Sequence, residues 1–138
     1  DEFLRVYPHC ICDGSDISKK ILVISKRNGK YRYLYKKSFE NKIQIVNKYS
    51  VVSLIGAMTY CKNHQSLFKL VSYYLVKNGY FIFTHRVDLW KELKFDNVLK
   101  KLTDFDSIYI SRPLNYLPNN KDFGSDIKIR IVLLKRNN

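Results

Sequence analysis

The sequence has no apolar run long enough to cross a bilayer, only three cysteines, and about half as many acidic as basic residues. A transmembrane helix needs about 20 consecutive, mostly apolar residues, and the charged residues 1–5 do not resemble a secretory signal. The sequence does not start with Met, so we expect it to begin inside a longer protein or after processing. These features favour a cytoplasmic protein without a membrane partner.

The three cysteines, Cys10, Cys12 and Cys61, are an odd number without regular spacing. This pattern argues against a disulfide framework and is typical of a reducing compartment. His9, Cys10 and Cys12 could suggest a metal site, but a zinc pair needs two or more residues between its cysteines, and no second pair follows. We therefore expect no metal, and we assign the first two cysteines to a strand.

The formal net charge is +13, from 25 lysines and arginines against 12 aspartates and glutamates. This charge fits a polyanionic partner, but it also follows from a lysine- and asparagine-rich composition. The basic residues are scattered, so a nucleic-acid partner is an alternative that charge alone does not establish. The 46% of apolar residues is enough for a core, and the length fits one domain over residues 1–138.

Short β-type segments alternate with helical segments, a pattern typical of a mostly parallel sheet covered by helices. Strands are expected at residues 10–15, 31–37, 49–56, 80–85, 107–112 and 127–134, and helices at 18–28, 64–78 and 89–102. The strand at 49–56 is nearly all apolar or small, which predicts burial on both faces. Gly29 and Gly79 would end the first two helices. The last two strands are joined by a polar loop without a helix, so we expect the final strand to run antiparallel.

Four segments resemble, in order, motifs of class I S-adenosylmethionine-dependent methyltransferases. Residues 14–22 (GSDISKKIL) resemble G-[IV]-D-[IL]-S-x-x-M-L, which follows the second strand of that family. Residues 26–34 (KRNGKYRYL) resemble A-x-x-[KR]-G-x-Y-x-x-L of the Williams–Beuren-region methyltransferase-like subfamily. Residues 49–52 (YSVV) stand where [FY]-D-[LV]-[VI] is usual, and residues 75–84 (LVKNGYFIFT) resemble L-K-P-G-G-x-[FL]-[IV]-F-[ST].

The resemblance implies an α/β fold: a mostly parallel Rossmann-like sheet with helices on both faces and a C-terminal antiparallel strand, with the first strand missing. The glycine-rich E/DxGxGxG loop that follows the family's first strand is also missing from the sequence. Ser38 stands where Asp or Asn commonly contacts the adenine amino group, Ser50 replaces the usual Asp, and Asn78 replaces a glycine. These departures leave open whether the chain is an active enzyme.

The resemblance also implies S-adenosylmethionine as cofactor, bound at the strand ends. Asp16 would accept hydrogen bonds from both ribose hydroxyls, although an Asp at a helix start also interacts favourably with the helix dipole. Ile17 would pack against the adenine face. Phe39 would stack on adenine or belong to the core, and Ser38 would offer a small polar contact.

Residues around the next two strand ends would complete this site. Gly56 and Ala57 would leave room for the cofactor, unless they only permit tight packing. Methyl transfer from a sulfonium is an in-line displacement, which needs alignment more than a base. Tyr60 would orient the acceptor and His85 could accept a proton, the alternatives being a partly buried tyrosine and a surface histidine. Residues 114–118 (LNYLP) would close the pocket or pack as an ordinary loop.

Three functions are compatible with these observations. The first is an S-adenosylmethionine-dependent methyltransferase of unknown acceptor, with a small molecule or a protein favoured. The second is a degenerate, non-catalytic methyltransferase-like fragment, motivated by the missing loop and the substituted motif positions. The third is an RNA-binding or RNA-methylating protein, motivated by the positive charge.

Overall fold

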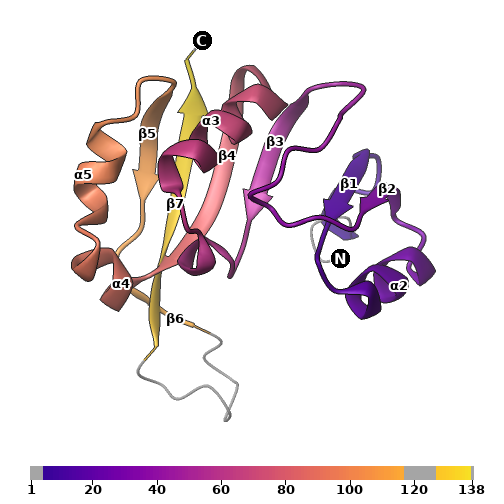
Figure 1. Ribbon diagram of the computed structural model, residues 1–138, viewed down its shortest axis with the longest axis horizontal. Coiled ribbons are helices and arrows are strands. Elements are labelled where there is room, and N and C mark those ends of the chain that lie inside the picture. The colour runs from indigo at the N-terminus through magenta and orange to yellow at the C-terminus, as the bar shows by residue number, and fades with distance from the viewer. Residues whose placement is uncertain (1–4, 117–126, 138) are drawn as a thin grey trace. The chain divides into compact units, whose positions relative to one another are not determined.

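The computed structural model describes residues 5–116 and 127–137. The chain divides into two compact units, Asp1–Gln44 and Ile45–Asn138, and each unit has its own sheet (Figure 1). Leu117 and Pro118, the last two residues of the segment predicted to close the pocket, lie outside the described residues. None of the helices in the described ranges is long and apolar enough to cross a bilayer.

In the first unit, β1 (Cys12–Ser15) and β2 (Tyr31–Tyr35) form a parallel two-stranded sheet, and α2 (Lys19–Arg27) connects them. The helix begins where predicted because the Ser18 hydroxyl accepts a hydrogen bond from the backbone N–H of Ile21. It ends before Gly29, whose φ of +66° suits a residue without a Cβ. The predicted strand–helix–strand order is therefore confirmed here.

No residue between 5 and 44 is buried as a whole. Two strands and one short helix cannot enclose a core, because so few elements bury little apolar surface between them. The apolar side of α2 is consequently exposed, including Ile21 and Ile24.

The second unit is a five-stranded sheet in the order β3–β4–β7–β5, with β6 paired to β7. Its strands are β3 (Tyr49–Leu54), β4 (Leu75–Arg86), β5 (Phe105–Ile110), β6 (Leu114–Asn115) and β7 (Lys128–Arg136). β3 and β4 are parallel, whereas β7 is antiparallel to both β4 and β5. This confirms the prediction that the last strand runs antiparallel. The strand, β7, lies between β4 and the edge strand β5. The two-residue β6 is not predicted by the sequence pattern.

The core lies between one face of this sheet and three helices, α3 (His64–Tyr74), α4 (Val87–Glu92) and α5 (Phe95–Lys100). Phe68 of α3 packs edge-on against Phe81 and Phe83 of β4, and Phe95 of α5 also meets Phe83. These ring contacts place α3 and α5 on the same face, and Figure 1 shows α3 lying over the sheet. The buried apolar side chains are Met58, Leu67, Phe68, Val71, Leu75, Phe81, Phe83, Trp90, Phe95, Leu99, Phe105, Val132 and Leu134.

The prediction that β3 is buried on both faces is wrong for the described residues, since Val51 is 47% exposed. Successive side chains of a strand point to opposite faces. Val52 and Leu54 lie beside Phe81 and Phe83 on the helix-covered face, so Val51 and Ser53 point to the other face. The helices of the second unit, as far as the structure describes them, cover only the first of these faces.

Two helices end differently from the prediction. The helix expected to reach residue 78 ends at Tyr74, and the chain continues directly into β4. Gly79 lies inside that strand, where a Cβ would come within 2.9 Å of the Val76 carbonyl oxygen, so close packing rather than a helix end requires glycine. The helix expected at 89–102 is two helices, separated at Lys94 with φ of 48°.

The break at Lys94 lets two large rings reach the same core. Trp90 and Phe95 are both buried, with ring centroids 4.8 Å apart. Residues five apart on one continuous helix point in directions about 140° apart, so an unbroken helix would turn one ring to solvent. The Trp90 indole N–H donates to Asp96 across the break, at 3.1 Å.

Candidate functional site

The carboxyl ends of β1 and β2 lie side by side in the first unit, where open parallel sheets bind ligands. Asp16 follows β1, and its N–H donates to the Tyr35 carbonyl at 3.1 Å. The Ser15 hydroxyl donates to the Lys37 carbonyl at 2.8 Å. These two bonds hold the start of the β1–α2 connection against the end of β2.

The Asp16 carboxylate lies at the start of α2, partly buried. Its Oδ1 accepts the Ser18 N–H at 2.7 Å, so the predicted alternative, a local contact at the helix start, is present. A carboxylate has about four lone-pair sites, and this bond uses one of them. The side chain of the neighbouring Ile17 is well exposed.

Ser38 and Phe39 follow the end of β2 in a tight turn. The Ser38 hydroxyl accepts the Glu40 N–H at 3.3 Å, and its carbonyl accepts the Asn41 N–H at 3.0 Å. The hydroxyl can still donate one hydrogen bond. Phe39 is half-buried, so it is not part of a closed core. The first unit therefore brings Asp16, Ile17, Ser38 and Phe39 to the ends of two adjacent parallel strands.

In the second unit, Gly56 and Ala57 follow the carboxyl end of β3 in the larger sheet. The Gly56 N–H donates to the Thr84 hydroxyl at 2.8 Å, which ties the end of β3 to β4. Gly56 has φ of +74°, and a Cβ there would lie 3.4 Å from the hydroxyl oxygen of Tyr116. The positive φ therefore favours glycine here, and the backbone lies in contact range of that tyrosine.

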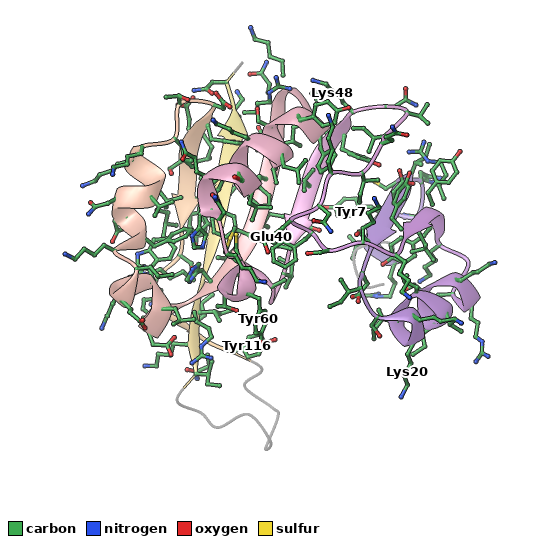
Figure 2. The ribbon with its side chains drawn as sticks, viewed as in Figure 1. Tyr7, Lys20, Glu40, Lys48, Tyr60 and Tyr116 are labelled. Carbon is green, nitrogen blue, oxygen red and sulfur yellow. The ribbon has the colours of Figure 1, made fainter. Side chains whose placement is uncertain are left out.

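Two tyrosines lie near this strand end. Tyr60 ends the 3₁₀ helix η1 (Met58–Tyr60) and is 75% exposed. Tyr116 follows β6, and its N–H donates to the Ile127 carbonyl at 2.9 Å. Figure 2 shows Tyr60 and Tyr116 at the same end of the second unit's sheet. Sequence reasoning points to the loop of Tyr116 but not to this residue, because its approach to Gly56 depends on the pairing of β6 with β7.

His85 does not join this group, although it comes near the end of β4. Its side chain turns to the helix-covered face and is 1% exposed, so the alternative of a surface histidine is wrong. The ring packs against Phe95 with centroids 4.4 Å apart, and Trp90 and His64 lie at 5.8 and 6.2 Å. Proton transfer by His85 would require this ring to leave the cluster.

The state of the His85 ring follows from these surroundings. Its Nδ1 lies 2.9 Å from the Arg86 carbonyl, which can only accept, so Nδ1 carries the proton. Burial lowers the pKa of His85, and this backbone hydrogen bond opposes the shift only in part. Next to it, Arg86 forms a two-bonded pair with Asp88, at 3.1 and 2.5 Å, which lowers the pKa of that exposed carboxyl.

No protein-family profile and no curated sequence matches the chain. Its fold, however, is similar to several solved methyltransferase structures. The N-methyltransferase NodS of Bradyrhizobium japonicum is 8% identical with a TM-score of 0.69, over 99% of this chain and 79% of NodS. The plantazolicin methyltransferase BpumL, in complex with a pentazolic desmethylPZN analog and S-adenosylhomocysteine, is 12% identical with a TM-score of 0.72, over 99% of this chain and 71% of BpumL.

A third similar structure is an S-adenosylmethionine-dependent methyltransferase from Clostridium acetobutylicum. It is 12% identical with a TM-score of 0.68, over 94% of this chain and 76% of that one. The chain therefore has the Rossmann-like fold of S-adenosylmethionine-dependent methyltransferases, which confirms the predicted fold class, although the sheet is mixed rather than mostly parallel. At these identities the similarity establishes the fold alone, so the Williams–Beuren subfamily and the site residues stay predictions.

Proposed function

We propose that residues 1–138 serve as one methyltransferase-like domain, an S-adenosylmethionine-dependent transferase acting on a small molecule or a protein. The observation that carries this proposal is the agreement of nearly the whole chain with methyltransferase folds, two of which, NodS and BpumL, have structures that contain S-adenosylhomocysteine. Polar and small residues at the carboxyl ends of β1, β2 and β3 support it, because ligands of such sheets bind at those ends.

Within each unit, the residues at these strand ends have the chemistry that an adenosyl ligand needs. Asp16 has lone pairs beyond the one used by Ser18, as acceptance from two ribose hydroxyls requires. The exposed Ile17 and the half-buried Phe39 offer apolar surface to adenine, and Ser38 can donate to it. Gly56 supplies a backbone without a Cβ, and Ala57 supplies a small side chain.

When bound, S-adenosylmethionine supplies a methyl group on a positively charged sulfur. The chain's task is then to hold the acceptor in line with that methyl, since alignment supplies much of the rate enhancement of such displacements. Tyr60 and Tyr116 carry hydroxyl groups that can donate to an acceptor or accept from it, and we assign them the positioning of the acceptor. His85, the second predicted catalytic residue, is buried at the Phe95 ring and has no part in this assignment.

A second candidate is a methyltransferase-like domain that no longer binds the cofactor. The hydrogen bond from Ser18 N–H to Asp16 favours it, because a carboxylate that holds the capping residue at a helix start has a structural reason to be present. The two candidates differ in one measurable property, the affinity for S-adenosylhomocysteine.

The deciding experiment is a calorimetric titration of the full chain and of Asp16→Asn with S-adenosylhomocysteine. Asparagine retains an amide oxygen for the Ser18 N–H, so the helix start and the melting temperature should be kept. It loses the negative charge that strengthens bonds from the ribose hydroxyls, so binding should weaken about tenfold or more. Asp106→Asn is the matched control, because Asp106 is an exposed aspartate near the amino end of β5 in the second unit, whereas the proposed site residues follow the carboxyl ends of strands.

Saturable binding that Asp16→Asn weakens and Asp106→Asn leaves unchanged supports the methyltransferase. Absence of heat at high ligand concentration with the folded chain supports the non-binding domain instead. Binding that both variants affect equally would remove Asp16 from the site.

A further inference from the structure

The positive charge of the first unit is concentrated in one stretch of the chain. Residues 19–37 contain eight basic residues and no acidic one. They are Lys19, Lys20, Lys26, Arg27, Lys30, Arg32, Lys36 and Lys37. All except Arg32 lie outside the strands or on the exposed sides of α2, and all eight are exposed. The stretch therefore forms a cationic surface around β2, although the charge is scattered when the whole chain is considered.

β2 carries three tyrosines and one cation, Arg32, with lysines flanking it on both sides, and the register sets which tyrosines share a face. The register shifts after the pair Cys12 and Tyr31, so that Arg32 has no partner residue in β1 in the strand pairing. Tyr33 and Tyr35 then lie opposite Asp13 and Ser15, on one face of the two strands. Their ring centroids are 6.3 Å apart, and Tyr33 is 48% exposed.

Asp13 fixes the backbone and the cation next to the exposed ring. Its Oδ1 accepts the Tyr33 N–H at 3.1 Å, and both oxygens accept from the Arg32 guanidinium, at 3.0 and 2.7 Å. The Arg32 guanidinium carbon lies 5.1 Å from the centre of the Tyr33 ring. This ion pair neutralises Arg32, so the net positive charge beside the rings comes from the lysines, above all Lys36 and Lys37 at the end of β2.

We propose that β2 and its flanking lysines bind single-stranded nucleic acid. Tyr33 and Tyr35 stack on successive bases, while Lys30, Lys36 and Lys37 contact phosphates. Paired aromatic rings on a sheet surface, bordered by cations, bind unpaired bases in sequence-tolerant modules because every base has a π-face. This binding needs no methyl transfer, so it stands apart from the function proposed above.

Two other readings of the same surface make different predictions. Lysines on a free strand edge also prevent edge-to-edge association, but this role does not require aromatic rings. An anionic membrane attracts lysines as well, but stable binding to a membrane is also favoured by a broad apolar face. The neighbouring tyrosine rings of β2 and the lysines that flank the strand fit bases and phosphates better.

The test is a fluorescence-anisotropy titration of the full chain with labelled oligouridine and oligothymidine of about 12 nucleotides, within the usual site size. The salt dependence is measured first. Each phosphate contact contributes about −0.7 to the slope of log affinity against log salt for single strands. Lys36→Gln with Lys37→Gln should make the slope less steep by about 1.4, twice that contribution. Comparing the two oligonucleotides shows whether the 2′-hydroxyl matters.

The stacking is tested with Tyr33→Leu, which keeps apolar bulk but has no π-face, and with Tyr33→Phe, which keeps the ring. The first should weaken binding about tenfold without changing the salt slope, and the second should bind like the original chain. Tyr73 provides the matched control because it is 41% exposed and pairs with Tyr74 at 5.5 Å on α3 of the other unit. Tyr73→Leu, and Lys100→Gln with Lys101→Gln, should leave the affinity nearly unchanged. Circular dichroism confirms that each variant is folded.

Loss of affinity confined to the β2 variants supports the proposal. Three results overturn it: no binding to either oligonucleotide, equal losses for the β2 and control lysines with no effect of Tyr33→Leu, or tighter binding to phosphatidylserine vesicles than to both oligonucleotides. The second result would indicate diffuse charge attraction, and the third would indicate a membrane surface.

Discussion

His85 is a titratable side chain inside a ring cluster, with Phe95 at 4.4 Å and His64 at 6.2 Å. Burial lowers its pKa, so the unfolded chain takes up a proton at a higher pH than the folded chain. Its contribution to stability is therefore full above the unfolded pKa of about 6.5 and is lost as the pH falls below that value. Asp88 and the Arg86 carbonyl oppose the shift without reversing it.

We expect the melting temperature to decrease as the pH is lowered from about 7.5 to about 5.5. His85→Phe should remove much of this decrease. Phenylalanine fills the ring cluster but does not titrate. His9→Gln is the control, because His9 is exposed in the first unit, and it should keep the full pH dependence. A His85→Phe chain with an unchanged slope would show that other groups cause it.

Gly56 and Gly29 form a natural pair for testing the strand-end site, since both have positive φ, +74° and +66°. Alanine at either position should cost about 1 kcal/mol of stability, measured by urea denaturation. A Cβ at Gly56 would also lie 3.4 Å from the Tyr116 hydroxyl, whereas a Cβ at Gly29 would have no neighbour within 4 Å. We expect only Gly56→Ala to weaken S-adenosylhomocysteine binding. Equal weakening by Gly29→Ala would mean that backbone strain, not the site, controls affinity.

Among the elements, α3 depends on a single capping residue. The Asn63 side-chain oxygen accepts the Ser66 N–H at 2.9 Å, and α3 carries three of the buried apolar residues of the core. Asn63→Ala should therefore destabilise the chain by about 1 kcal/mol, and Asn63→Asp should restore the stability. Ser18→Ala, which removes the longer 3.4 Å cap of α2, should cost less. A larger loss from Ser18→Ala would show that α2 contributes more to stability than its exposure indicates.

The elements that sequence reasoning placed correctly are those with local signals. Ser18 and Gly29 mark the two ends of α2 as predicted, and short β-type segments indicated the position of every described strand except β6. The split at Lys94 and the early end of α3 have no local signal, because they come from packing of Trp90 and Phe95 and from the close approach at Gly79. For the site, motif spacing found the strand ends. It could not show that His85 faces the helices, since that depends on which residues of β4 point to the helix-covered face of the sheet.

The two units of the whole molecule differ in how much they bury. Every described residue from 5 to 44 is at least partly exposed, whereas Phe81 and Phe83 of β4 are fully buried between β3, β7 and the helices. Amide hydrogen exchange reports this difference, because protection follows the free energy of local opening. We expect the amides of β4 to exchange slowest and those of β1 and α2 to exchange much faster. Similar protection in both units of the free chain would contradict this expectation.

A bound ligand should change this pattern in a way that tests the proposed function across the molecule. A ligand that binds only the closed state stabilises it by about 2.7 kcal/mol at 100 times its Kd, which is about a hundredfold slowing of exchange. If S-adenosylhomocysteine contacts Asp16 and Gly56, exchange should slow at residues 16–22 of the first unit and at 56–60 of the second. Asp16→Asn at the same ligand concentration should lose the slowing in the first unit, while Asp106→Asn should keep it. Slowing confined to the second unit would mean that Asp16 does not hold the ligand, because only groups that the ligand stabilises gain protection.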